Sequence, residues 1–198
     1  MKNNTALVLC VGTLIMTGCG GTTGSQPDGD GNTVAAAPGS VAPPANATPG
    51  SVAPPANWKA TDACSVIDKA AMATIVGKPV AETSLALVHE SDGTTAATSQ
   101  CTYELTDGTQ ATLMMRWSPI ADNSERAINL ARNGLQETMK AFGKSLETID
   151  GLGKAAFWAG AAGQLNVFIG EDRFVIISMP TGPAAKNHAI TLARKLGA

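Results

Sequence analysis

The side chains best suited to chemistry in this chain are four cysteines and two histidines. The cysteines are Cys10, Cys19, Cys64 and Cys101, and the histidines are His89 and His188. A thiol can accept a lipid group, form a disulfide or bind a metal ion, whereas an imidazole can act as a base or as a metal ligand. The place of each residue in the chain decides among these roles.

Cys19 ends an apolar N-terminal stretch that resembles the signal peptide of bacterial lipoproteins. After Lys2 come about a dozen mostly apolar residues, the length of a secretory signal core and too short for a bilayer span of about 20 residues. Residues 14–19, LIMTGC, resemble a lipobox, with Met16 where leucine is most common. The resemblance implies that residues 1–18 are removed and that Cys19 carries a diacylglycerol and an acyl chain such as palmitate. The alternative is an ordinary cleaved signal.

Lipidation would hold the rest of the chain in the cell envelope. Two or three acyl chains, at about 0.8 kcal/mol for each buried CH₂, give essentially permanent membrane anchoring. In a host with two membranes, Gly20 in place of an inner-membrane retention aspartate favours the outer membrane, facing the periplasm. In a host with a single membrane, the same anchor would present the protein at the cell surface.

Residues 19–57 comprise the lipidated cysteine and a tether rich in Gly, Pro, Ser and Ala. The segment PGSVAPPAN occurs at residues 38–46 and again at 49–57, closer together than the repeats of about 20 residues or more that build folded arrays. This composition predicts a disordered, partly polyproline linker. Residues 28–32, DGDGN, begin like a calcium loop but lack its later glycine and glutamate, so we expect no metal site there.

Cys64 and Cys101 are the cysteines that remain once Cys10 is removed with the signal and Cys19 is lipidated. An exported compartment favours disulfides, and a bridge that closes a loop of about 38 residues stabilises a fold by about 3–4 kcal/mol. We therefore expect a disulfide between Cys64 and Cys101. The alternatives are two free thiols or, less favourably, a metal site built on two cysteines.

Residues 58–198 have the pattern of one α+β domain. Apolar residues at helical spacing predict helices at residues 66–76 and 124–142 and at the C-terminus. Period-two alternation predicts strands at residues 85–88, 101–105, 111–117, 155–158, 165–169 and 174–179, the last of them central in the sheet because it is apolar on both faces. The order predicts an antiparallel sheet packed against two or three helices and covered mainly on one face.

Four short motifs resemble small bacterial envelope lipoproteins of uncharacterised function. They are ACSVI at residues 63–67, GKPV at 77–80, QCTY at 100–103 and GLGKAAFW at 151–158. In those lipoproteins a cysteine-bearing helix precedes a Cys-x-Tyr strand, and a Gly-Leu-Gly turn leads to an aromatic strand. The resemblance covers about residues 62–196, and it implies the fold and the disulfide but no catalytic residues. Lys154 stands where an acidic residue is expected.

The sequence predicts no catalytic, metal or cofactor site. Neither His89 nor His188 has a partner at zinc-site spacing, no G-x-S-x-G motif occurs, and residues 151–153 lack the third glycine of a dinucleotide-binding loop. The net charge of −2, without a basic stripe, argues against a nucleic-acid partner. We therefore expect that the protein is not an enzyme and needs no cofactor.

The anchor, the tether and the lack of catalytic groups lead to the hypothesis of a non-catalytic binding or accessory domain. Its partner would be a protein or another envelope component, and an inhibitor of an envelope-directed toxin is one version. Aromatic and arginine side chains anchor interfaces, so the candidate contacts are Trp58, Trp117, Trp158, Tyr103 and Arg116. For each tryptophan a core position is the alternative. A carrier of a small apolar ligand and a small envelope hydrolase with a hidden site also stay open.

Overall fold

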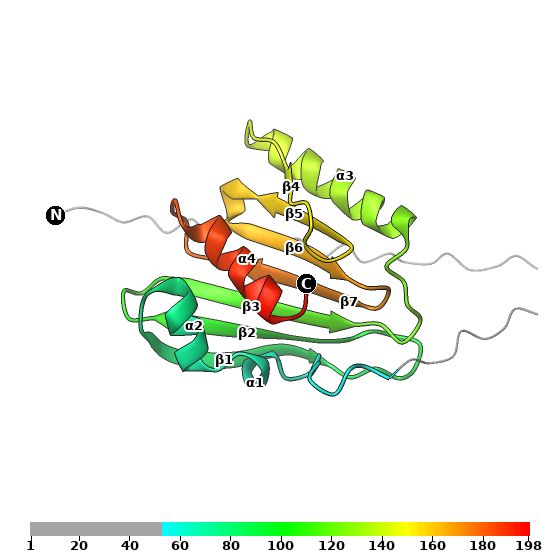
Figure 1. The fold of residues 1–198 in the computed structure, drawn as a ribbon, viewed down its shortest axis with the longest axis horizontal. Coiled ribbons are helices and arrows are strands. Elements are labelled where there is room, and N and C mark those ends of the chain that lie inside the picture. The colour runs from blue at the N-terminus through cyan, green and yellow to red at the C-terminus, as the bar shows by residue number, and fades with distance from the viewer. Residues whose placement is uncertain (1–52) are drawn as a thin grey trace, which may run out of the picture. The chain divides into compact units, whose positions relative to one another are not determined.

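One seven-stranded antiparallel sheet organises the part of the chain that the structure describes. The structure is a computed structural model, and it describes residues 53–198. The expected signal peptide, the lipidation site Cys19 and the tether up to residue 52 lie outside the described residues. The strand order is β1-β2-β3-β7-β6-β5-β4, and every neighbouring pair is antiparallel (Figure 1).

The elements follow one another in an α+β order. The strands are β1 (Val80–His89), β2 (Ala97–Leu105), β3 (Gln110–Trp117), β4 (Glu147–Thr148), β5 (Ala155–Ala159), β6 (Gln164–Ile169) and β7 (Arg173–Ser178). The helices are α1 (Ala63–Val66), α2 (Lys69–Val76), α3 (Glu125–Ala141) and α4 (Ala185–Lys195), with a 3₁₀ turn, η1, at Gly160–Ala162.

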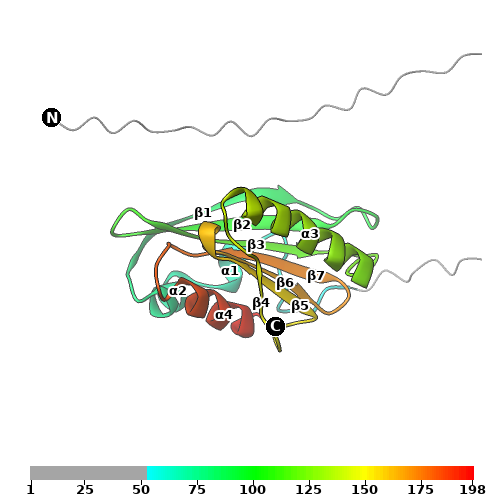
Figure 2. The same ribbon diagram turned by 90° about the horizontal axis from the view of Figure 1, so that it is seen from above.

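The helices divide between the two faces of the sheet. Helices α1, α2 and α4 lie on one face, and α3 lies alone on the opposite face (Figure 2). The main core forms between the sheet and α1, α2 and α4, where Tyr103 of β2 and Leu113 of β3 are fully buried. A smaller cluster of Ile128, Phe157 and Phe168 joins α3 to β5 and β6. The sheet is therefore covered mainly, but not only, on one face.

Several predicted elements are confirmed because their signals are local. Residues 107–108 form the β2–β3 hairpin, where Gly108 has a φ of 79°. Helix α3 begins after Ser124, whose side chain accepts a 3.2 Å hydrogen bond from the Ala127 amide. Strand β7, predicted to be central, lies between β3 and β6 in the middle of the sheet. The predicted α+β class and antiparallel sheet are thus confirmed.

The helix predicted at residues 66–76 is in fact two helices. Ile67 is extended, with φ of −127° and ψ of 112°, and it separates α1 from α2. Asp68 caps the second helix, because its side chain accepts a 2.7 Å hydrogen bond from the Ala71 amide. The predicted helix therefore begins about one turn before α2 does, and the apolar spacing of residues 66–76 spans a real break.

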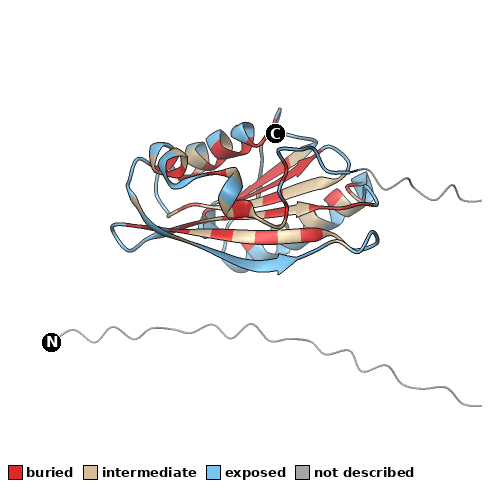
Figure 3. Ribbon diagram, turned by 90° about the horizontal axis from the view of Figure 1, so that it is seen from below, coloured by how far each residue is buried: buried red, intermediate tan, exposed pale blue. Residues whose placement is uncertain are grey.

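Strand β1 is longer than the predicted residues 85–88 and forms one edge of the sheet. Its outer residues are exposed, in contrast to the buried residues of β2 beside it (Figure 3). The pairing with β2 shifts between Ala86 and His89, and within this bulge Leu87 has a φ of 52°. Leu87 and Val88 are 68% and 51% exposed, so apolar side chains stand at a free sheet edge.

Candidate functional site

Two residues expected as binding contacts, Tyr103 and Trp117, lie in the core. Tyr103 is fully buried, and its hydroxyl donates a 2.7 Å hydrogen bond to the Ile67 carbonyl. Trp117 is 7% exposed, and its Nε1 donates a 3.2 Å hydrogen bond to Oδ2 of Asp172. The expectation that they form a binding surface is therefore corrected, because strand alternation places both on the inner face of the sheet.

The other candidate contacts do not form one surface with them. Trp58 is 4% exposed and packs in the main core, with the guanidinium of Arg173 5.2 Å from its ring centre. Arg116 lies on the outer face of β3, the reverse of Trp117, and forms a bidentate ion pair with Asp122. Trp158 is also largely buried, but it lines a surface cavity beside α3.

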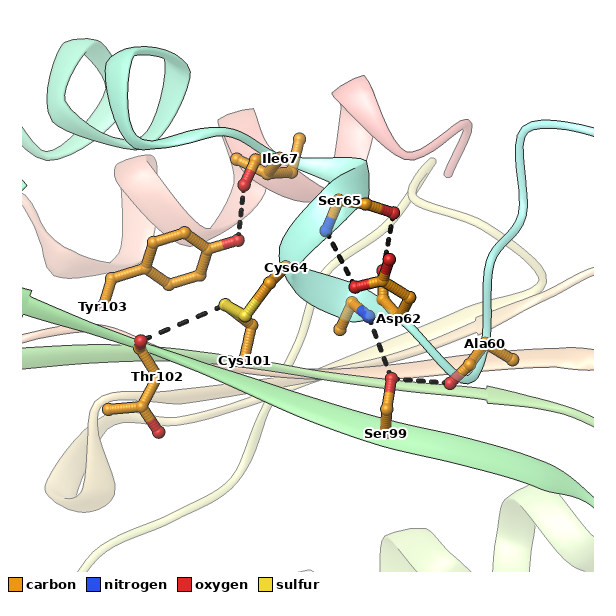
Figure 4. The surroundings of a disulfide bond; sticks show 10 residues. Ala60, Asp62, Cys64, Ser65, Ile67, Ser99, Cys101, Thr102 and Tyr103 are labelled. Atoms are coloured by element: carbon orange, nitrogen blue, oxygen red, sulfur yellow. Dashed lines mark hydrogen bonds between the residues drawn. A yellow bond between two sulfur atoms is a disulfide. The ribbon is translucent and has the colours of Figure 1, made fainter. Parts of the chain in front are cut away.

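The predicted disulfide between Cys64 and Cys101 is confirmed. The S–S distance is 2.04 Å and the two Cα atoms are 4.9 Å apart (Figure 4). It joins α1 to β2, so it ties the start of the folded domain to the sheet. Its role is structural, since Cys101 is fully buried.

An apolar groove opens under the C-terminal half of α3, on the face of the sheet opposite to the disulfide. We call it the α3 groove. It has a volume of about 180 Å³, and its lining residues are Leu135, Thr138, Met139, Phe142, Ala159, Ala161, Ala162 and Gln164. Met139 is buried at its base, whereas Phe142 on its border is 67% exposed. Because η1 presents only small side chains toward α3, the two elements do not close on each other.

The end of α3 also leaves the groove uncovered. The helix ends in a Schellman motif: the Gly143 amide donates to the Lys140 carbonyl at 2.9 Å, and the Lys144 amide donates to the Met139 carbonyl at 3.1 Å. In this motif the residue at the Lys144 position commonly packs an apolar side chain on the helix. Here it is a lysine, so no apolar side chain caps Met139 at this point.

A second cavity adjoins the α3 groove and shares Met139 and Ala161 with it. We call it the rim cavity. Its volume is about 370 Å³, and its other lining residues are Lys144, Ser145, Glu147, Trp158 and Gly160. In contrast to the α3 groove, it carries a cation and a carboxylate, together with the hydroxyl of Ser145. An apolar space and a polar space therefore meet at the C-terminal end of α3.

The charges of the rim cavity do not cancel. Glu147 accepts hydrogen bonds of 2.8 and 3.2 Å from the Lys186 ammonium, so its carboxylate is already neutralised. Lys144 forms no ion pair with another described residue. Lys186 does not itself line the cavity, but because it pairs with Glu147, the group formed by Lys144, Glu147 and Lys186 carries a net charge of +1.

A further cavity lies where α2 faces the start of α4. It has a volume of about 270 Å³ and is lined by His188, Lys78 and the loop around Pro180. Lys78 is paired with Asp107 at 2.5 Å. His89 is far along the chain at the end of β1, where its Nε2 lies 3.3 Å from Oγ1 of Thr95. The two histidines therefore do not share one cavity.

Two exposed aspartates have lowered pKa values for local reasons. The backbone amide of Thr95, followed by other donors in the same turn, holds the pKa of Asp92 well below its usual range. The ammonium of Lys78 does the same to the pKa of Asp107. Both carboxyl groups close turns between strands and lie outside the α3 groove. They stabilise loops and do not mark a catalytic pair.

Lys154, the basic residue at a turn where an acidic one was expected, has a structural partner. Its ammonium donates hydrogen bonds of 2.7 and 2.6 Å to the Glu171 carboxylate and of 2.8 Å to the Asn123 carbonyl. It therefore joins three loops at one end of the sheet. The positive charge of Lys154 therefore has a local structural role.

Residues 53–198 hold neither a cluster of metal ligands nor a membrane-spanning helix. Within that range no three His, Cys, Asp or Glu side chains are grouped so that they could hold a metal ion. Nor does that range contain a helix that is both long and apolar enough to span a bilayer.

Sequence reasoning missed the α3 groove because its walls looked like ordinary core. Leu135, Met139 and Phe142 continue the apolar stripe of α3, which predicts burial. Only Ile128 and Met139 on this helix are buried, however, and Phe142 at its end is 67% exposed. The signal that could have found the groove is residues 160–163, GAAG, which offer the stripe no large partner.

Comparisons of the chain with protein-family models, with curated proteins and with solved structures find no match.

Proposed function

We propose that the protein is a non-catalytic binding domain of the cell envelope, with the α3 groove as its binding surface. In this proposal Cys19 carries the lipid anchor, residues 19–57 are a flexible tether, and no cofactor takes part. The observation that carries the proposal is the uncovered apolar space between α3 and η1, bordered by the exposed ring of Phe142. Concave, mostly apolar spaces are the usual form of small-ligand sites.

The size of the groove limits what it can hold. Sites for drug-sized ligands measure about 300–1,000 Å³. The α3 groove, at about 180 Å³, is nearer to the engineered cavity of about 150 Å³ that holds one benzene molecule. It therefore suits one alkyl or aromatic group and not a large enclosed ligand. This favours the apolar-ligand alternative over a broad protein interface built on tryptophans.

The tether supports a binding role because it raises the local concentration of the domain at the membrane. A flexible link converts a second encounter into an intramolecular one, with an effective concentration in the millimolar range for short linkers. A groove that holds a single apolar group binds weakly on its own. Attachment to the envelope would make such weak binding sufficient.

Methyl NMR with a small neutral probe tests this function. Toluene should shift the methyl signals of Met139 and Leu135 in the α3 groove and leave Met72, on the opposite side of the sheet, unchanged. Ala161→Phe should remove the effect by filling the groove while the other signals stay dispersed. Shifts of Met139 and Leu135 no larger than those of Met72 would contradict the proposal.

Strand β1 favours a second candidate function, the binding of a protein partner at the sheet edge. Leu85, Leu87 and Val88 are 43%, 68% and 51% exposed, and the backbone of Leu87 is strained by its positive φ. Bulges at sheet edges often redirect side chains near binding sites. A photo-crosslinker at position 87 should capture one envelope protein that a crosslinker at position 59 does not. Identical products at both positions would exclude this role.

A further inference from the structure

We propose that the α3 groove and the rim cavity together bind a single-chain fatty acid. The alkyl chain lies in the groove, and the carboxylate lies in the rim cavity beside Lys144. This inference rests on the proposed binding function of the groove and adds the chemical class of the ligand. The ligand is an anionic amphiphile because an apolar and a positively charged space adjoin.

The groove supplies the apolar half of the site. Six of its eight lining residues are Leu, Met, Phe or Ala, and the two polar ones, Thr138 and Gln164, leave the base around Met139 apolar. By comparison with the benzene-sized cavity, the groove has room for about six to eight carbon atoms. Each methylene buried there should strengthen binding about fourfold until the chain outgrows the groove.

The rim cavity supplies the polar half. Lys144 is its unpaired cation among the described residues, and Ser145 beside it carries a hydroxyl. Glu147 would repel a carboxylate, but its charge is neutralised by Lys186 at 2.8 Å. The remaining single positive charge matches a single carboxylate.

Lys144 must also offset the negative end of the α3 dipole. The C-terminus of a helix carries a partial negative charge and disfavours an anion. A carboxylate bound here therefore depends on Lys144, whose backbone is held by the hydrogen bond from its amide to the Met139 carbonyl. The structural alternative is that Lys144 only complements the helix dipole. The two roles differ in what happens when a ligand is added.

A series of ligands of increasing chain length separates these two roles of Lys144. The full chain with Cys19→Ser, which removes the expected lipid, is titrated by NMR with carboxylates and alcohols of six to twelve carbons. Octanoate should bind about fivefold tighter than 1-octanol, the effect expected of one partly exposed ion pair. Affinity should rise with chain length and level off near eight carbons, with the largest shifts at Met139 and Ala161.

Four variants identify the groups responsible. Lys144→Gln should remove the preference for octanoate over 1-octanol, and Lys144→Arg should keep it. Lys59→Gln, the same charge change at an exposed residue of the N-terminal segment, should have no effect. Ala161→Phe should weaken both ligands at least tenfold, and the thermal transition of each variant reports whether the fold is kept.

The outcomes distinguish the two proposals. If 1-octanol binds the groove as tightly as octanoate, or if Lys144→Gln keeps the preference, the fatty-acid assignment is overturned and groove binding survives. If neither compound shifts Met139, both proposals fail. Octanoate shifts centred on another cavity would also overturn the assignment.

Discussion

The hydroxyl of Tyr103 donates a 2.7 Å hydrogen bond to the carbonyl of Ile67. Tyr103 lies in β2, two residues after Cys101 of the disulfide. Ser99, two residues before Cys101, accepts a 2.9 Å bond from the Ala63 amide and donates a 2.7 Å bond to the Ala60 carbonyl. Ser99, Cys101 and Tyr103 are alternate residues on one face of β2. Each of them is bonded to the segment of residues 60–67, through hydrogen bonds or the disulfide (Figure 4). The first folded segment after the expected tether is fastened directly to the sheet.

Loss of the disulfide should lower stability by about 3–4 kcal/mol. The bridge spans a sequence separation of 37, and closing a loop of this length restricts the unfolded chain by about that free energy. The change is Cys64→Ala with Cys101→Ala, measured as the free energy of unfolding in urea. A reductant should lower the midpoint of the unchanged protein to that of the double variant and leave the variant itself unaffected. If neither the double substitution nor the reductant lowers the urea midpoint, the hydrogen bonds of Ser99 and Tyr103 hold residues 60–67 without the disulfide.

Tyr103→Phe should destabilise the domain by about 1–2 kcal/mol at neutral pH. The substitution keeps the ring and leaves the buried Ile67 carbonyl without its donor. Burial, followed by the charges of Asp68 and Asp62, raises the pKa of Tyr103 above its usual value. A raised pKa in the folded state means that the stability is complete below the unfolded-state pKa of about 10 and is lost as the pH rises further.

Alkaline unfolding therefore checks the same residue. Tyr103 is the single tyrosine of the chain, so tyrosinate absorbance reports its ionisation without overlap. The absorbance should rise together with unfolding and not before it, and Tyr103→Phe should lose less stability between neutral pH and pH of about 11. Tyrosinate formation in the still-folded protein at pH of about 10 would contradict the buried placement.

How far the sequence predicts this structure depends on how local each signal is. The β2–β3 hairpin follows from Asp107 and Gly108, the start of α3 from Ser124, and the centre of the sheet from the two-sided apolar pattern of β7. The disulfide follows once two other cysteines are assigned to the leader. These features need no knowledge of distant contacts.

The remaining features depend on contacts between distant segments. The break at Ile67 depends on two hydrogen bonds: Tyr103 donates to the Ile67 carbonyl, and Asp68 caps the helix that follows. The burial of Trp117 depends on which face of β3 meets α1. Similarly, the apolar stripe of α3 predicts a buried helix, and only the shape of η1 shows that Phe142 stays exposed. The candidate site was therefore unpredictable from periodicity alone.

Asp122→Asn should lower stability at neutral pH by less than about 1 kcal/mol and have no effect in acid. Hydrogen bonds from Arg116 lower the pKa of Asp122, and the pair is partly exposed, so water screens it. Because the folded-state pKa is depressed, this stability is present above the unfolded-state value of about 3.9 and is lost as the pH falls through the folded-state pKa. Urea unfolding at several pH values measures it.

A double-mutant cycle with Arg116→Gln isolates the pair. The coupling between the two substitutions should be favourable at neutral pH and weaken in acid, as the pH falls through the folded-state pKa of Asp122. Coupling that is the same at both pH values would mean that packing, and not charge, joins Arg116 to Asp122.

Gly153→Ala should destabilise the domain far more than Gly151→Ala, although both glycines have a positive φ in the same turn. A Cβ at position 151 meets nothing within 4 Å, so alanine there costs only the left-handed backbone, about 1–2 kcal/mol. A Cβ at position 153 would clash with the carbonyl oxygen of Phe168, which also accepts a hydrogen bond from the Lys154 amide at 2.7 Å. The turn must then separate from β6, at a cost on the order of 3 kcal/mol or more. Urea midpoints of the two variants measured side by side decide this, since equal losses would show that backbone strain alone explains both glycines and that the turn does not pack closely on β6.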